Sequence, residues 1–307
     1  MAIVTPALLS SLMTGFRKEF QDGLGMAETQ WNRIASEVPS SSKSNTYGWL
    51  GQWPGFREWV GARVVKDMAA HGYEIVNKLW ESTVGVKRTD IEDDNLGIYA
   101  PMFREMGRAT AAHPDELVFG LLKAGDATLC YDGQFFFDVD HPVYPNADGT
   151  GTATLVSNYD SGGATPGPAW FLLDTSRAIK PIIFQRRLAP EFTAMTKMDD
   201  EQVFMADEYR YGVRARHNVG FGFWQMAYMS KAPLTAANFN AAYDAMCQFT
   251  ADGGRPLGIK PNLLVVPPQL RVDALKVVKS ELIVDGGAGV TNINRDVVDV
   301  LVSPWLI

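Results

Sequence analysis

The stretch from residue 56 to residue 125 constrains this chain most, because it joins a long strand pattern to a long helix pattern. Residues 56–68 and 73–88 carry β-branched side chains set among single charges, which is typical of strands. Gly72 closes the short segment between them, so we predict a long β-hairpin. Neither strand has a continuous apolar face, and an isolated hairpin is not stable in water. The hairpin therefore needs a neighbouring surface.

A helix is predicted directly after the hairpin. Thr89 and Glu92 have the spacing of a capping box, in which two side chains satisfy the free N–H groups of a first turn. Proline inside a helix removes a hydrogen bond, so we expect the main helix to start near Pro101 and to kink or break near His113. Gly125 ends it. The positions that recur at three and four and form one buried stripe are Tyr99, Met102, Phe103, Met106, Ala109, Thr110, Leu117, Val118, Leu121 and Leu122.

Long and unusual strings run through the chain. They are REWVGARVVKD in the hairpin, IEDDNLGIYAPMFREMGRA and HPDELVFGLLKAG in the helical stretch, and DGQFFFDVDHPV, WFLLDTSRAIKPIIFQRR, RHNVGFGFWQMAY and VLVSPWLI further along. Together these strings resemble the major head subunits of Mu-like phages and prophages, the gpT family. The similarity covers nearly the whole chain.

The resemblance implies an α+β chain with the Hong Kong 97-type (HK97-like) fold of phage major capsid proteins. In that fold an N-terminal arm would take residues 1–55, and the hairpin would be the extended loop at residues 56–89. A peripheral domain at residues 90–235 would carry the spine helix, at about residues 90–124. An axial domain would take residues 236–307.

The same resemblance implies a structural function. The chain would be a major capsid protein that assembles with itself, as hexamers and pentamers, into an icosahedral shell around double-stranded DNA. Its further partners would be a scaffold, a maturation protease, a portal and a decoration protein. We expect it in the virion, and in the host cytoplasm during assembly.

Residues 6–22 predict an amphipathic helix, with Leu9, Leu12 and Phe16 on its apolar face. The polar, serine-rich segment at residues 36–47 suits an extended connector. A helix tethered by such a connector could reach a neighbouring subunit, or it could pack on its own domain. The resemblance favours the neighbour.

The hairpin carries Trp59 and Trp80 on strands that lack an apolar face of their own. Large aromatic side chains of this kind need a partner surface when they are buried. We predict that the partner is an adjacent subunit. The residues predicted at contacts between subunits are Leu9, Leu12, Phe16, Trp59, Arg63 and Trp80.

The rest of the chain predicts a turn-rich surface excursion at residues 125–167, strands at 170–173 and 179–184, and a strand pair within 213–228. A helix at 238–249, a buried strand at 263–266 and a helix at 268–282 follow. Helix, strand and helix in that order indicate a compact α/β layer, which we assign to the axial domain.

No catalytic residue, cofactor-binding residue or metal ligand is predicted. Asp138, Asp140 and His141 look like a metal cluster, but no further ligand stands at a characteristic spacing, and the carboxylates suit turn amides better. Dinucleotide, phosphate-loop, nucleophile-elbow and zinc-protease motifs do not occur in the sequence. The alternative to a capsid protein is a cytosolic α+β enzyme with an unrecognised active site, for which this cluster is the best evidence.

The net charge is −7, and lysine and arginine are scattered without a basic stripe, so sequence-specific nucleic-acid binding is not expected. No apolar run approaches the roughly 20 residues of a membrane span, and the first residues do not resemble a secretory signal. Cys130 and Cys247 are too few for a disulfide framework, so both are predicted to be buried thiols.

Some capsid proteins of this fold join a lysine of the extended loop to an asparagine of another subunit. Lys66 and Lys78 are candidates by position, with Asn292 or Asn294 as partners, but none of them stands in a recognisable motif. Exposed lysines that keep the hairpin soluble explain the same positions, and we favour that interpretation.

Overall fold

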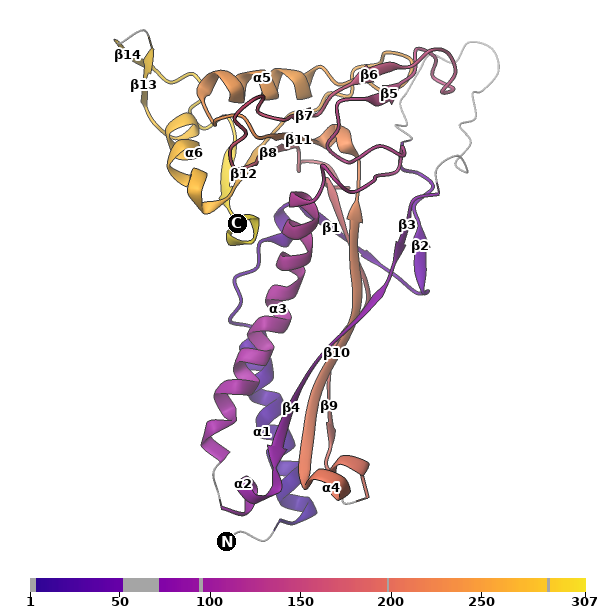
Figure 1. Cartoon of the computed structure of the whole chain (residues 1–307), viewed down its shortest axis with the longest axis vertical. Coiled ribbons are helices and arrows are strands. Elements are labelled where there is room, and N and C mark those ends of the chain that lie inside the picture. Colours follow the sequence, from indigo (N-terminus) through magenta and orange to yellow (C-terminus); the bar gives the residue numbers. More distant parts are fainter. Residues whose placement is uncertain (1–3, 52–71, 94–95, 198, 286–287) are drawn as a thin grey trace.

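The computed structural model describes residues 4–51, 72–93, 96–197, 199–285 and 288–307. It has two parts (Figure 1): a long stem, made of α1, α3 and a four-stranded sheet, and a wider crown, made of a five-stranded sheet with α5 and α6. None of the described helices is long and apolar enough to cross a membrane.

The stem sheet has the order β1-β9-β10-β4, formed by β1 (Ala35–Pro39), β9 (Ile182–Met195), β10 (Glu208–Phe221) and β4 (Lys78–Lys87). β1 runs parallel to β9, and the other neighbours are antiparallel. The β4–β10 register is regular, whereas β9 and β10 shift register near Arg216. Such shifts increase the local twist of a sheet.

Two helices lie along this sheet and run in the same direction: α1 (Pro6–Leu24) and α3 (Ala100–Lys123). Thr5 caps α1, because its hydroxyl oxygen accepts a hydrogen bond from the backbone N–H of Leu8 at 3.2 Å. A separate apolar core forms where α1 and α3 meet each other and the sheet. Its buried members are Leu9, Phe16, Phe20, Val86, Ile91, Tyr99, Phe103, Met106, Val203, Tyr209, Tyr211 and Val213.

The crown sheet has the order β15-β12-β8-β11-β7. Its strands are β7 (Tyr159–Asp160), β8 (Trp170–Leu173), β11 (Ala227–Ser230), β12 (Leu263–Val266) and β15 (Asp299–Val302). Every residue of β8 and β12 is buried, as in a strand covered on both faces. Two helices, α5 (Ala236–Cys247) and α6 (Arg271–Val278), belong to the same part.

Short elements complete the described chain. They are β2 (Ser44–Thr46), β3 (Glu74–Val76), α2 (Arg88–Glu92), β5 (His141–Val143), β6 (Thr154–Val156), α4 (Glu201–Ala206), β13 (Leu282–Asp285) and β14 (Ala288–Thr291), with single 3₁₀ turns at Trp31–Arg33, Leu96–Ile98, Trp224–Met226, Pro268–Leu270 and Pro304–Leu306.

The structure describes only the second strand of the predicted hairpin, because residues 56–68 lie outside the described residues. Its second strand exists, but it is divided into β3 and β4 at Asn77. β3 pairs with β2, and β4 pairs over its whole length with β10. The neighbour that this strand needs is therefore a strand of its own chain.

The helix after the hairpin differs from the prediction in two ways. α2 begins at Arg88 with Lys87 as its N-cap, so the predicted capping box is wrong: Thr89 lies inside the helix and makes no cap. α3 begins at Ala100, as expected from Pro101, but it is not broken near His113 and runs through Pro114 to Lys123. Buried side chains on both sides of the proline, Phe103 and Met106 before it and Val118, Phe119 and Leu122 after it, offset the lost hydrogen bond.

Three further predictions need correction. The excursion at residues 125–167 is not confined to the surface, because Phe136 and Phe137 are buried in the main core. The strands within 213–228 do not pair with each other: β10 belongs to the stem sheet and β11 to the crown sheet. The helix at 268–282 ends at Val278, and a strand starts at Leu282.

The crown sheet also crosses the predicted boundary between residues 235 and 236. β8 and β11 precede that boundary and β12 follows it, yet β12 pairs with β8 along residues 263–265. A sheet is one packing unit, so the two sides of this boundary share a core. The helix at 238–249 and the strand at 263–266 are confirmed as α5 and β12.

Candidate functional site

The predicted contact residues of the N-terminal helix lie against their own chain. Leu9 and Phe16 are buried in the stem core, and Leu12 is half-buried against it. The Phe16 ring stacks on Phe103 of α3, and its edge meets Tyr211 of β10 at a centroid distance of 5.1 Å. The helix is thus confirmed and packs inside its own subunit. A contact with a second subunit stays a prediction for these residues.

Trp80 of β4 also packs on its own chain. Its indole N–H donates a hydrogen bond to the backbone carbonyl of His217 at 3.0 Å, and its ring meets the His113 ring with centroids 4.4 Å apart. The two histidines lie side by side, with His113 Nδ1 3.0 Å from His217 Nε2. A surface cavity of about 230 Å³ opens beside this group, between α3 and the sheet.

Both of these histidines have a pKa below the ordinary value for histidine. Burial lowers the pKa of His113, although the nearby Glu116 opposes the shift. Burial, reinforced by the charges of His113 and Arg186, lowers the pKa of His217 to about 4. The pair therefore stays neutral near pH 7.

The remaining residues of the predicted loop site are not brought together. Trp59, Arg63 and Lys66 lie outside the described residues. Lys78 is exposed on β4. Asn292 is buried and its side-chain amide donates to the carbonyls of Val277 and Ser280, both at 2.9 Å, which explains it as a structural residue.

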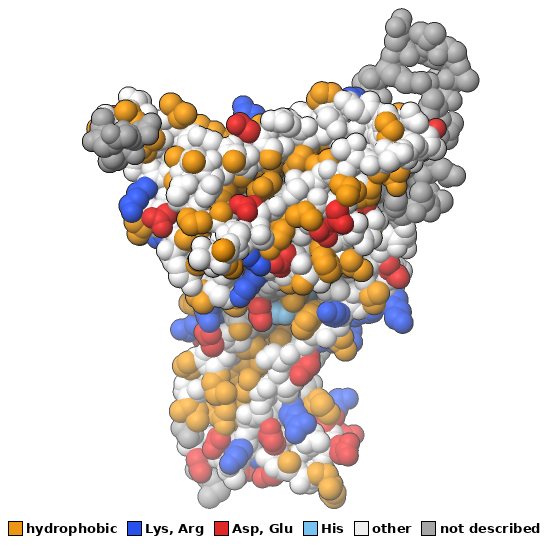
Figure 2. All heavy atoms as spheres, turned by 45° about the horizontal axis from the view of Figure 1, so that its top comes forward, with side chains coloured by type: hydrophobic (Ala, Val, Ile, Leu, Met, Phe, Trp, Pro, Cys, Tyr) orange, Lys and Arg blue, Asp and Glu red, His pale blue; other side chains and the backbone are white. Residues whose placement is uncertain are grey.

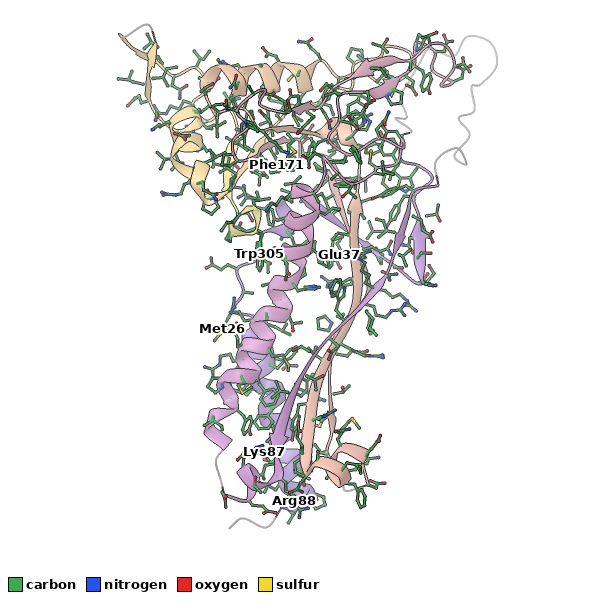
Figure 3. The ribbon with its side chains drawn as sticks, in the orientation of Figure 1. Met26, Glu37, Lys87, Arg88, Phe171 and Trp305 are labelled. Carbon is green, nitrogen blue, oxygen red and sulfur yellow. The ribbon has the colours of Figure 1, made fainter. Side chains whose placement is uncertain are left out.

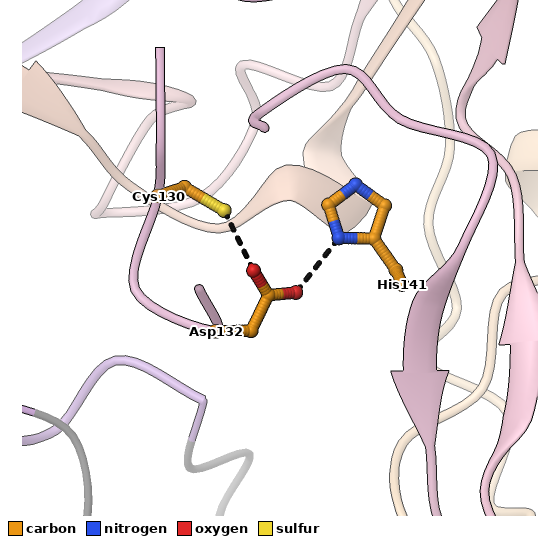
Figure 4. A group of neighbouring side chains, drawn as sticks. All are labelled: Cys130, Asp132 and His141. Carbon is orange, nitrogen blue, oxygen red and sulfur yellow. Dashed lines mark hydrogen bonds and ion pairs between the residues drawn. The ribbon is translucent and has the colours of Figure 1, made fainter. Parts of the chain in front are cut away.

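The structure does not bring all three residues of the predicted metal-like cluster to one point: the Asp138 and Asp140 carboxylates interact with each other, but His141 has other partners. The Asp138 carboxylate accepts hydrogen bonds from the backbone N–H groups of Phe135 and Val139, at 3.1 and 2.8 Å. This confirms that it satisfies turn amides. His141 instead faces Asp132, and the third member of this group is Cys130 (Figure 4).

This Cys130–Asp132–His141 group was missed in the sequence because Asp132 stands in an Asp-Gly turn, where a structural role suffices. Its geometry is close: His141 Nδ1 lies 2.7 Å from Asp132 Oδ2, and the Cys130 thiol donates to Asp132 Oδ1 at 3.0 Å. Burial, with the neighbouring Asp132 charge, raises the pKa of the Cys130 thiol, so it is no nucleophile at neutral pH. Cys247 is exposed, and the prediction that it is buried is wrong.

The far end of the stem presents a second group that sequence reasoning missed. Phe204 and Met205 of the short helix α4 are 82% and 73% exposed. The backbone N–H of Arg88 donates to the carbonyl of Asp207 at 3.0 Å, which holds α4 beside α2. Arg88 marks this end of the stem in Figure 3. The apolar pair between acidic residues in the sequence EQVFMADE was the available signal.

Residues 9–306 match the protein family described as Mu-like prophage major head subunit gpT. The chain belongs to this family. The match covers all but the ends of the chain, as the long shared strings predicted.

Two curated relatives agree. The chain is 51% identical over 304 residues to the major capsid protein of Escherichia phage Mu, covering 99% of this chain and 100% of the relative. It is also 51% identical over 294 residues to the Mu-like prophage FluMu major head subunit of Haemophilus influenzae, covering 95% of each. The chain is therefore a major capsid protein of the Mu-like type, and the enzyme alternative finds no support among these structural relatives.

Solved structures support the same fold. The chain superposes on the subunit of the procapsid of bacteriophage JBD30 with a TM-score of 0.85 at 64% identity, covering 98% of this chain and 100% of that one. The bacteriophage JBD30 capsid gives a TM-score of 0.78 at 44% identity, with both chains fully covered. The predicted α+β, Hong Kong 97-type capsid fold is confirmed.

Proposed function

We propose that this major capsid protein assembles with itself, as hexamers and pentamers, into a closed icosahedral shell around double-stranded DNA. The observation that carries the proposal is the match over nearly the full length to the phage Mu subunit and to the JBD30 procapsid and capsid subunits. A closed shell needs rotational and heterologous contacts on one subunit. The long stem and wide crown offer several separate surfaces for them.

In this proposal the part of the stem formed by α3, β9 and β10 is the peripheral domain, with α3 as the spine helix, and the crown is the axial domain. This division replaces the sequence boundary at 235/236, because the crown sheet joins β8 and β11 to β12 and β15. Residues 1–55 remain the proposed arm and residues 56–89 the proposed extended loop. In the arm, α1 packs on its own stem, so its proposed contact with a neighbour would use the side that faces away from α3.

For the contacts between subunits, we retain Trp59 and Arg63 in the extended loop and add the exposed pair Phe204 and Met205 at the stem end. Exposed apolar side chains at a tip are typical of association surfaces. Leu9, Leu12, Phe16 and Trp80 would support the subunit that carries such contacts, because they pack on their own chain.

The DNA would be enclosed without sequence-specific binding. The net charge is −7, and among the described residues on the side drawn in Figure 2, lysine and arginine are interspersed with acidic side chains. The JBD30 capsid is decorated with minor capsid protein trimers. By analogy, we propose a decoration protein, a scaffold, a maturation protease and a portal as partners, with assembly in the host cytoplasm before the protein enters the virion.

Co-expression of the chain with the phage scaffold, followed by light scattering and electron microscopy, tests this function. We expect closed particles of uniform size. A species that stays monomeric or dimeric at every concentration would exclude self-assembly.

A pair of variants tests the stem end. Phe204→Asp places a charge in the proposed contact, whereas Phe204→Leu keeps the position apolar. Both should fold normally, since substitutions at exposed positions usually change stability by no more than about 0.5 kcal/mol. We expect particles from Phe204→Leu and none from Phe204→Asp. Normal particles from both variants would remove α4 from the contacts but leave the capsid function standing.

A further inference from the structure

Three side chains with metal-binding atoms converge where the turn at residues 130–132 meets β5: Cys130, Asp132 and His141. One ligand atom from each lies within 4.8 Å of the other two. His141 is fully buried, Cys130 is 6% exposed and the Asp132 side chain is 9% exposed. Thiolate, carboxylate and imidazole are the groups that bind zinc in proteins.

Asn158 determines which nitrogen of the His141 ring carries a hydrogen. The Asn158 amide nitrogen donates to the backbone carbonyl of Phe136 at 2.8 Å, and its oxygen accepts from the backbone N–H of Asp138 at 2.9 Å. This orients the oxygen toward His141 Nε2, at 3.2 Å, so that Nε2 must carry a hydrogen. In a neutral imidazole, Nδ1 then presents a lone pair.

That lone pair faces a carboxylate. Nδ1 of His141 lies 2.7 Å from Asp132 Oδ2, and two acceptors so close require a cation between them. Either a proton or a metal ion between the two atoms meets this requirement. The Cys130 sulfur lies 3.0 Å from Asp132 Oδ1 and is a third possible metal ligand. A proton shared between His141 and Asp132 would not require a sulfur atom at this position.

We propose that Cys130, Asp132 and His141 form a binding site for a divalent cation of the zinc type. The cation is held by the Cys130 thiolate, an Asp132 oxygen and His141 Nδ1, with water in the fourth position. The Cys130 proton leaves to solvent when the metal binds. Tetrahedral zinc keeps nitrogen and oxygen ligands about 3.3 Å apart, so the gap between Nδ1 and Oδ2 widens by roughly 0.6 Å on binding.

The surroundings suit such a site. The hydrogen bond from Nε2 to Asn158 is the kind of outer contact that orients a ligating histidine. The His141 ring also stacks on Trp224, with centroids 4.0 Å apart and planes inclined by 10°, which fixes its rotation. A surface cavity of about 390 Å³, lined by Gly72–Glu74 and Cys130–Gly133, lies beside the site and gives the ion and its water a path.

A metal here would join the turn at residues 130–132 to β5 at His141, and so would fasten the segment that buries Phe136 and Phe137. A metal ion that binds the folded chain but not the unfolded chain raises the unfolding temperature, and the increase grows with the metal concentration. The inference concerns the stability of the subunit and does not depend on how the shell assembles.

Cobalt(II) chloride added to the purified full-length chain tests the site, because a thiolate bound to cobalt gives a charge-transfer band in the near ultraviolet. We expect this band to saturate at one cobalt per chain and to disappear when zinc chloride displaces the cobalt. Cys130→Ser should lose the band, while the matched control Cys247→Ser should keep it. Zinc should raise the melting temperature of the native chain and of Cys247→Ser, but not of Cys130→Ser.

Cys130→Ser retains a hydroxyl that can donate to Asp132, so it is expected to fold, and a far-ultraviolet circular dichroism spectrum checks this. If the native, folded chain shows no thiolate band and no shift of melting temperature with cobalt or zinc, hydrogen bonds alone join the three side chains and the proposal is wrong. A band that survives in Cys130→Ser and is lost in Cys247→Ser would also overturn it.

Discussion

Phe16 of α1 stacks on Phe103 of α3, with ring centroids 4.3 Å apart and ring planes inclined by 24°. Both rings are buried, and both also meet Tyr211 of β10 edge-on. This contact joins the N-terminal helix to the spine helix and the stem sheet. It makes the arm helix a part of the subunit core.

Replacing Phe16 by alanine should therefore destabilise the subunit itself. Truncating a buried phenylalanine costs about 3–5 kcal/mol, because apolar burial is lost and a cavity remains. Urea unfolding of the free chain measures the change. Phe204→Ala removes the same side chain from an exposed position and should cost less than about 0.5 kcal/mol. Equal effects of the two variants would show that α1 does not pack as described.

Gly107 allows α1 and α3 to approach each other. A Cβ atom at Gly107 would lie 2.1 Å from the backbone oxygen of Phe20, and one at Gly23 would lie 2.0 Å from that of Arg104. Gly107→Ala should therefore force the helices apart and lower the free energy of unfolding. Gly120→Ala, in the same helix with open space around it, should be neutral or stabilise by up to about 1 kcal/mol. A thermal melt of each variant decides, and a Gly107→Ala chain as stable as Gly120→Ala would contradict the close contact.

The paired histidines predict a loss of stability in mild acid. The pKa of His217 is about 4 in the folded chain, below its ordinary value of 6.5, so the unfolded chain binds more protons between these two values. The contribution of His217 to the free energy of unfolding is fully present above pH 6.5. It should fall as the pH drops toward 4, by at most about 3 kcal/mol. Protonation of both rings, 3.0 Å apart, would oppose folding further.

Denaturant unfolding of the free chain at a series of pH values measures this slope. A chain with both His113→Gln and His217→Gln lacks the pair but keeps polar side chains of similar size. Its stability should depend less on pH between 4 and 6.5 than that of the native chain. Identical pH profiles for the two chains would assign the acid sensitivity to other groups.

Asp115 of the spine helix α3 holds the backbone at residues 30–31. It is buried, and its carboxylate accepts hydrogen bonds from the backbone N–H groups of Trp31 at 2.7 Å and Gln30 at 3.0 Å. Asp115→Ala leaves these donors unsatisfied and should cost about 1–3 kcal/mol for each that stays buried. Asp115→Asn keeps one acceptor oxygen and should lose less.

Asp148 provides the matched control for that prediction. It also accepts a backbone N–H, from Thr150 at 3.1 Å, but in an exposed turn where water can replace it. Urea unfolding should show little change for Asp148→Ala. If Asp115→Ala were equally harmless, the contact between α3 and residues 30–31 would not stabilise the fold.

The sequence alone determined the elements whose cause is local. The helix at residues 6–22, the helix start near Pro101, the strand at 170–173 and the buried strand at 263–266 were predicted from periodicity and proline position, and they are confirmed. The shared strings also identified the capsid family, because such strings span the chain from end to end.

Only the tertiary structure decided which of these elements meet. β4 pairs with β10, more than a hundred residues away, because both cover the stem core, and no local signal encodes that choice. α3 continues through Pro114 because packing against α1 and the sheet outweighs the loss of one hydrogen bond. Cys130, Asp132 and His141 converge because the turn that carries Asp132 folds back onto β5. Contacts between distant residues depend on the whole packed core, so a pattern along the chain could not reveal them.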